Sequence, residues 1–283
     1  GVCNGKETCL TCPQDCGQCP TKCDTFTYGV TARAVDIVII VDQSGSMSQE
    51  ISSVKAYLNQ FASYISGVKI DYRVIMLAKR GTSTYYICIP PPLGGANCAD
   101  STRYKQVDQL INSWDSLKQY QAHAATIEGF MRKNSLRQIV EITDDRSYYV
   151  TAAAFNSWIK ARPGYSDYVF HSIVGLNTGG CVASVGQQYI DLSNMTKGMK
   201  FHICNANWTT LFQQLGKSVA GSATAQYPLT KTPLLNKVEV SYNGVKQTQG
   251  VQYAYIPGSN WVQLKPPYPA NNTTIKICYQ YAP

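Results

Sequence analysis

The run VDIVIIV at residues 35–41 constrains the fold more than any other part of the sequence. It is apolar and largely β-branched apart from Asp36, so a strand here has to be covered on both faces, as strands of parallel sheets are. Residues 47–65 then show the spacing of an amphipathic helix, and DYRVIML at 71–77 forms a second apolar run. This succession predicts a βαβ unit.

Strands and helices continue to alternate beyond residue 77, which predicts one α/β domain over residues 34–222. We expect a Rossmann-like, doubly wound and mainly parallel sheet with helices on both faces. The further segments are an edge strand at 85–89, a helix at 116–133, a strand at 136–143, a helix at 152–160, a strand at 167–176, a helix at 184–195, a strand at 200–204 and a helix at 208–220.

Two smaller modules are expected on either side of this domain. Residues 1–23 place six cysteines among Gly, Pro and Thr with few apolar residues, which predicts a module held by disulfides. Its run VCNGKETCLTCPQDCGQC resembles a short cysteine-rich repeat of large bacterial surface proteins. Residues 225–283 contain short alternating runs separated by Asn-Gly and Pro-Gly, which predicts an antiparallel β module, with residues 24–33 as a candidate addition.

Eleven cysteines are many for a chain of 283 residues, which favours disulfides and a secreted, extracellular or cell-surface location. We expect the pairs Cys88–Cys98, Cys181–Cys204 and Cys23–Cys278, with free thiols as the alternative for the first pair. The five remaining cysteines are odd in number, so one is free, intermolecular or paired outside this sequence. No apolar run approaches the roughly 20 residues that span a bilayer, so no membrane span is expected.

A short polar sequence follows the strand at residues 35–41. Asp42 ends that strand, and Ser44 and Ser46 lie on a turn that contains Gly45 and precedes the helix. Ligands of an open parallel sheet bind beyond the carboxyl ends of its strands. Asp and Ser are also favoured at helix N-caps, so capping is the simpler alternative. The apolar strand before this sequence and the helix after it favour a binding site.

The sequence here resembles the von Willebrand factor A domain, whose metal-ion-dependent adhesion site (MIDAS) reads Asp-x-Ser-x-Ser, matched by Asp42, Ser44 and Ser46. The resemblance implies that an Asp from a strand ending in Thr-Asp-Gly completes the site. Asp144, at the end of LRQIVEITDD, matches that Asp, and Asp145 stands where the family has Gly. This departure adds a carboxylate that could strengthen cation binding or only alter the loop.

The resemblance also implies a Thr from an intervening loop. Thr126 is one candidate, but too few residues separate it from Asp144 to hold both a helix and a strand. Ser113 leaves room for both, and its hydroxyl can replace that of Thr. Hydroxyl and carboxylate oxygens suit a hard cation, so we expect Mg²⁺, with Mn²⁺ or Ca²⁺ as alternatives.

Residues near the expected cation are candidates for contact with a partner. They are Gln43, Trp114, Asp145, Arg146 and Tyr148, with Tyr149 beside them. Exposed aromatic side chains and Arg are common anchors of interfaces. Trp114 and Tyr148 could equally pack into the core.

The resemblance implies a non-enzymatic adhesion or ligand-binding protein, in which the cation bridges to a carboxylate on a protein or surface ligand. The layout also resembles secreted von Willebrand A proteins of predatory and gliding bacteria. The alternative is a self-assembling subunit of a cell-surface filament or sheath, since a polar, Tyr-rich exterior and strand pairing suit assembly. The net charge of +8 is not concentrated in a Lys/Arg cluster, and His123, His171 and His202 have no nucleophile nearby in sequence, so neither nucleic-acid binding nor catalysis is expected.

Overall fold

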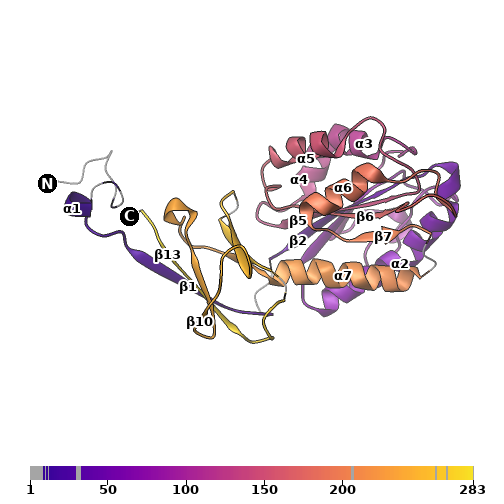
Figure 1. Ribbon diagram of the computed structural model, residues 1–283. Coiled ribbons are helices and arrows are strands. Elements are labelled where there is room, and N and C mark those ends of the chain that lie inside the picture. The colour runs from indigo at the N-terminus through magenta and orange to yellow at the C-terminus, as the bar shows by residue number, and fades with distance from the viewer. Residues whose placement is uncertain are drawn as a thin grey trace. The chain divides into compact units, whose positions relative to one another are not determined.

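The computed structural model describes residues 9, 11, 13–29, 33–204, 207–258, 260–265 and 267–282. The chain divides into two compact units (Figure 1). Residues 34–223 form the larger one, called the α/β unit here, and residues 1–33 together with 224–283 form the β unit. None of the described helices is long and apolar enough to cross a bilayer.

The α/β unit is built on a six-stranded sheet in which every pair of neighbouring strands is parallel. The strand order β4-β3-β2-β5-β6-β7 means that the chain moves outward from β2 to β4 and then returns to the other side of β2. The order therefore reverses between β2 and β5, and a crevice forms at such a point beyond the carboxyl ends of the strands. The strands are β2 (Val35–Val41), β3 (Tyr72–Leu77), β4 (Tyr104–Val107), β5 (Leu136–Thr143), β6 (Val169–Val174) and β7 (Lys200–His202).

Helices cover both faces of this sheet, as the sequence predicts (Figure 1). Helices α2 and α7 pack on one face, and α3, α4, α5 and α6 pack on the other. Their bounds are α2 (Ser48–Gly67), α3 (Ser116–Ala122), α4 (Ala124–Phe130), α5 (Ala152–Lys160), α6 (Gln187–Thr196) and α7 (Trp208–Thr224).

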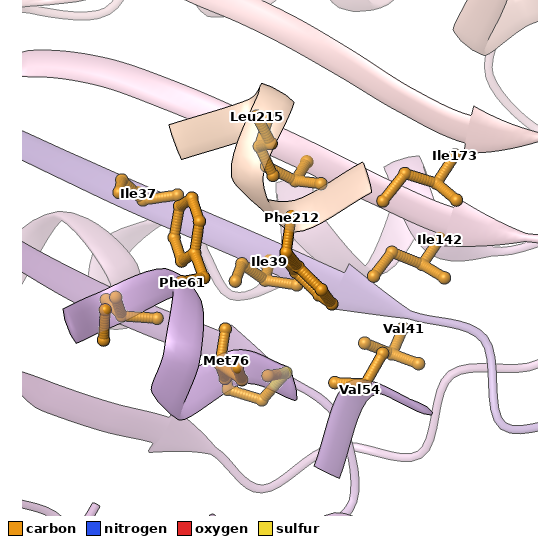
Figure 2. Close-up of a cluster of buried hydrophobic side chains, with 14 of the residues drawn as sticks. Ile37, Ile39, Val41, Val54, Phe61, Met76, Ile142, Ile173, Phe212 and Leu215 are labelled. Carbon is orange, nitrogen blue, oxygen red and sulfur yellow. The ribbon is translucent and has the colours of Figure 1, made fainter. Parts of the chain in front are cut away.

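Alternate side chains of β2 enter the two cores. Ile37 and Ile39 point toward α2 and α7, where Phe61 and Phe212 lie with ring centroids 5.8 Å apart (Figure 2). Val38 and Ile40 belong to the core under the other helices. All seven residues of β2 are buried, which explains why six of them are apolar and why Asp36 needs polar partners.

Two predicted elements of the α/β unit are wrong in detail. Residues 85–89 form no strand, and only an isolated bridge joins Arg80 to Ile87. The edge strand is instead β4, whose sequence YKQV is half polar and which pairs with β3 alone among the described strands. The helix expected at 116–133 is divided at His123 into α3 and α4 and ends at Phe130.

The β unit contains two antiparallel sheets, of order β1-β13-β9-β10 and β11-β12-β8. Residues 21–27 pair along their whole length with the last strand, so the segment before the α/β unit and the segment after it share one sheet. The strands are β1 (Thr21–Thr27), β8 (Gln226–Pro228), β9 (Glu239–Tyr242), β10 (Val245–Lys246), β11 (Tyr253–Ile256), β12 (Trp261–Leu264) and β13 (Thr274–Gln280), with a short helix α1 (Pro13–Cys16) before them.

Disulfides close the described loops and termini. The three expected pairs, Cys88–Cys98, Cys181–Cys204 and Cys23–Cys278, are all present, and Cys9 pairs with Cys19. Cys23 and Cys278 are also register partners of β1 and β13, so the bond reinforces a sheet that already exists. The expectation of one odd cysteine extends to residues 3 and 12, which lie outside the described residues.

Replacing Phe212 by Ala should destabilise the α/β unit. The ring is 1% exposed and contacts Phe61 and Trp208, so its removal leaves a cavity in the core, at a cost of about 3–5 kcal/mol. Chemical denaturation measures this loss. Val68→Ala, at a position that is 43% exposed, is the matched control and should change stability by less than about 0.5 kcal/mol. Equal effects of the two substitutions would contradict the assignment of Phe212 to the core.

Candidate metal centre at the carboxyl end of the sheet

The end of β2 positions the first group of side chains. The Asp42 N–H donates to the Ile142 carbonyl at 3.0 Å, which keeps this residue beside β5 after the regular strand has ended. Its Oδ1 atom accepts the Ser44 N–H at 2.8 Å, which turns the chain toward the 3₁₀ turn Gly45–Met47 and α2. The Ser44 hydroxyl caps neither this turn nor the helix. The capping alternative therefore finds no support in the geometry.

The end of β5 brings a second carboxylate to the same place. The Ser44 and Ser46 hydroxyl oxygens are 3.3 Å apart, and the Ser46 hydroxyl is near enough to Asp144 to oppose the rise in the pKa of that carboxyl. Asp144 is 2% exposed, and its Oδ1 atom has no hydrogen-bond partner among the described residues. The structure thus gathers Asp42, Ser44, Ser46 and Asp144 at the point where the strand order reverses.

Thr143 holds the two strand ends together and is a site residue that the sequence reasoning missed. Its hydroxyl donates to Asp42 Oδ2 at 2.7 Å and accepts the Asp145 N–H at 3.1 Å. Ser184 is a second missed residue. Its N–H and that of Ala183 donate to the Asp144 carbonyl at 3.0 and 2.9 Å. Thr143 is visible in the sequence as the first letter of Thr-Asp-Asp, but Ser184 carries no sequence signal.

The carboxylates of this cluster lack positive partners. Burial raises the pKa of Asp42 and that of Asp144, and the neighbouring Asp144 charge raises the pKa of Asp42 further. Burial also raises the pKa of Glu50, on the first turn of α2, with Asp144 again contributing. In the described part of the chain, no Lys, Arg or His forms an ion pair with Asp42, Glu50, Asp144 or Asp145.

Asp36, at the opposite end of β2, is a buried carboxylate that does have a cationic partner. Asp36 is fully buried, and its oxygens accept hydrogen bonds from the Arg132 guanidinium at 2.6 and 2.9 Å and from the Ser135 hydroxyl at 2.5 Å. Asp42 has hydroxyl and backbone partners but no cationic one. Of the two described carboxylates on either end of β2, the one at the amino end thus has a cationic partner and the one at the carboxyl end has none.

Ser113, the candidate from the intervening loop, lies in the turn before α3 and is partly exposed. No hydrogen bond is present between its side chain and the cluster within the described residues, but its neighbours are attached to the site. The Ile111 carbonyl accepts the Gln43 N–H at 2.9 Å, and the Trp114 carbonyl accepts the Tyr148 N–H at 3.2 Å. Thr126, the alternative, lies inside α4 rather than on this loop.

Two predicted contact residues face inward instead. Gln43 is 5% exposed, and its amide group donates to the carbonyls of Lys79 and Tyr85 at 3.1 and 2.6 Å and accepts the Lys79 N–H. Asp145 is 8% exposed, and its carboxylate accepts hydrogen bonds from the Trp114 indole N–H at 2.7 Å, the Arg146 N–H at 2.8 Å and the Ser184 hydroxyl. Both residues thus use their polar atoms to brace the loops around the site.

The other predicted contact residues lie at the surface. Trp114, Tyr148 and Tyr149 are 49%, 66% and 56% exposed, and Arg146 is exposed as well. The Trp114 and Tyr148 rings are 6.0 Å apart, and those of Tyr148 and Tyr149 are 5.3 Å apart. The alternative that Trp114 or Tyr148 packs into the core is wrong.

The donor atoms fit a hard divalent cation. Asp42 and Asp144 supply carboxylate oxygens and Ser44 and Ser46 supply hydroxyl oxygens, a set that suits Mg²⁺. The unpartnered Oδ1 atom of Asp144 and the uncompensated charge of the cluster are what a bound cation would satisfy. Among the described residues, no three His, Cys, Asp or Glu side chains are grouped so as to hold a metal ion, here or elsewhere, so the candidate centre depends on its two hydroxyls as well as its two carboxylates.

Comparisons with known proteins add little. No protein-family model matches the chain, and no curated protein matches it. Among solved structures, the chain is similar to the pilus adhesin SpaC from Lactobacillus rhamnosus GG, with a TM-score of 0.41 and 10% sequence identity over 92% of this chain. The matched part is 41% of that adhesin, so this chain spans less than half of its length. A similarity this low does not establish a shared fold or function.

Replacing Asp144 by Asn should stabilise the protein at neutral pH when no divalent cation is present. A raised folded-state pKa means that the folded state binds protons more tightly than the unfolded state, so this carboxylate lowers the free energy of unfolding as pH rises. Removing its charge removes that penalty. The gain should shrink as pH falls toward about 4, near the ordinary pKa of Asp.

Thermal unfolding with a chelator present, followed from pH 4 to 8, measures the effect of Asp144→Asn. Asp71→Asn, which removes a carboxylate with a 71% exposed side chain, is the matched control and should change stability little. A loss of stability in Asp144→Asn at pH 7 would show that the uncompensated charge is not a liability in the cation-free protein.

Proposed function

We propose that the α/β unit is a non-enzymatic adhesion module that binds an acidic group of its partner through a divalent cation. The cation is Mg²⁺ in this proposal, with Mn²⁺ or Ca²⁺ as alternatives, and its ligands are Asp42, Ser44, Ser46 and Asp144, with Ser113 as a fifth. The observation that carries the proposal is the convergence of two buried, uncompensated carboxylates and two hydroxyls at one strand edge. The match to the MIDAS pattern supports the same assignment.

The protein side chains determine which atoms face the cation. The Ser44 N–H and the Thr143 hydroxyl hold the two oxygens of Asp42, and the bonds to the Asp144 carbonyl hold the loop after β5. These bonds fix the Asp42 carboxylate and the backbone of Asp144 before any cation arrives, so less conformational entropy is lost on binding. When bound, the cation supplies a positive charge with coordination positions that the protein does not fill, and a partner carboxylate can enter there.

Binding rather than catalysis is favoured by the environment of the histidines. Burial lowers the pKa of His171 to about 3, and its ring bonds to Gln138 at 2.7 Å. His202 bonds to Asn177 and His123 to the Gln119 carbonyl, so all three make structural contacts. A secreted or cell-surface location is part of the proposal, because the disulfides require an oxidising compartment.

Asp42→Ala should abolish cation binding and cation-dependent attachment together. In the wild type, Mg²⁺ at 100 times its dissociation constant should raise the free energy of unfolding by about 2.7 kcal/mol. Calorimetry measures the cation affinity, which we expect the substitution to lower by at least about 100-fold. Retention on carboxylate-coated beads, against the same beads after amidation, measures attachment.

Glu239→Ala is the matched control for Asp42→Ala, because Glu239 is an exposed carboxylate of the β unit that forms a surface ion pair with Lys246. It should bind Mg²⁺ and beads as the wild type does. Attachment that survives both Asp42→Ala and chelation would show that the cation does not bridge the contact.

A second candidate function is assembly into a surface filament or sheath. It is favoured by β1, a seven-residue strand that pairs with β13 on one side and with no described strand on the other. Such an edge can accept a strand from another molecule. Light scattering over a range of concentrations tests this, and Thr25→Pro, which removes one backbone N–H from β1, should prevent any assembly. A monomer at all concentrations would exclude self-assembly of this chain.

A further inference from the structure

Exposed apolar side chains of the α/β unit are concentrated on the edge that carries the candidate metal centre. In the described part of this unit, the large hydrophobic residues with the highest exposure on that edge are Tyr85, Leu110, Trp114, Tyr148 and Tyr149. They follow β3, β4 and β5, beyond the carboxyl ends of those strands. The two others are Val68, which follows α2, and Met195, which lies in the last turn of α6. Both helices lead back to the opposite edge of the sheet. Exposed apolar groups gathered in this way mark an interaction surface.

Hydrogen bonds attach these residues to the metal centre. The Gln43 side chain donates to the Tyr85 carbonyl at 2.6 Å, and the Gln43 N–H donates to Ile111, the residue after Leu110, at 2.9 Å. Trp114 is attached through its indole N–H to Asp145 at 2.7 Å. Because Gln43 and Asp145 are the residues next to Asp42 and Asp144, the apolar groups are placed on both sides of the carboxylates.

The charges on this edge complement an acidic partner. Lys118 lies 4.7 Å from the centre of the Tyr149 ring, and Arg146 is exposed beside Asp145. Both add positive charge next to the aromatic residues, and the proposed cation adds more between them. Aromatic residues and Arg around a central charged contact are the composition of an interface with another protein.

We propose that the partner is a protein segment in which one Asp or Glu is flanked on both sides by apolar or aromatic side chains. The acidic side chain enters the metal centre, one flank contacts Tyr85 and Leu110, and the other contacts Trp114 and Tyr148. The proposal rests on the proposed function, since it needs the cation at Asp42 and Asp144. The aliphatic Leu110 and the two-sided apolar flanks favour a protein segment over an acidic polysaccharide, which has carboxylates along its length but little aliphatic surface.

A phage-displayed library of random 12-residue peptides tests this on the full chain. Selection in Mg²⁺ with elution by a chelator should enrich peptides that have one acidic residue between apolar ones. The consensus peptide is then synthesised, and its affinity is measured for the wild type, Tyr148→Ser and Tyr85→Ser. Each substitution should weaken binding at least about tenfold, as loss of an interface anchor does.

Met195→Ser is the matched control, because it removes an exposed apolar side chain, 49% exposed, at the end of α6 and should leave peptide affinity unchanged.

Mg²⁺ calorimetry on the same proteins separates the two proposals. If Mg²⁺ does not bind the wild type, the proposed function itself fails. If Mg²⁺ binds but the enriched peptides lack an acidic residue or apolar flanks, or bind Tyr148→Ser and Tyr85→Ser at full strength, the partner assignment is wrong. Binding of soluble polygalacturonate alone, with no peptide enriched, would also overturn it.

Discussion

The parallel pairing of β2 with β5 is the interaction on which the rest of the α/β unit depends. The seven residues of β2 are covered by core side chains on both faces, and each of them pairs in register with β5. The pairing continues past the strand ends through the bond from the Asp42 N–H to the Ile142 carbonyl. Two stretches about 100 residues apart in the chain are thereby joined at their carboxyl ends. The site owes its position to the core, since any slip of this register would separate Asp42 from Asp144.

Burying these carboxylates without a basic partner costs free energy, which hydrogen bonds from the surrounding loops partly offset. Two carboxylates are buried together without a basic side chain, whereas Asp36 on the same strand has Arg132. Thr143 and the Ser44 N–H stabilise the charge on Asp42, while Asp145 and Gln43 use their polar atoms to fasten the loops. Gln43 and Asp145, which the sequence suggests as partner contacts, thus support the loops. The polar groups nearest the carboxylates stabilise the cluster. The side chains around it that face solvent are mainly aromatic.

The sequence predicts the sheet and its edge well, because the information is local and apolar. The strand β2 is apolar apart from Asp36, so it could be placed from its pattern, and Asp42, Ser44 and Ser46 follow it directly. Their assignment as cation ligands came from the resemblance to the MIDAS pattern. The strand β4 could not be found, because YKQV is half polar and owes its place to its pairing with β3. The inward positions of Gln43 and Asp145 were also hidden, since their partners Tyr85, Trp114 and Ser184 lie on loops that are remote in sequence. Contacts between loops leave no periodic pattern.

Two disulfides act on those loops. Cys88–Cys98 closes the segment after β3, a few residues beyond Tyr85, and Cys181–Cys204 closes the segment that carries Ser184. Loops of this kind have little core of their own and would sample many conformations, so a covalent link removes much of that freedom before a ligand binds. The Tyr85 carbonyl is then held in place to accept the Gln43 amide N–H, and the Ser184 hydroxyl is held in place to donate to Asp145. The cysteines therefore serve the site as well as the fold, because they fix the loops on either side of the carboxylates that β2 and β5 bring together.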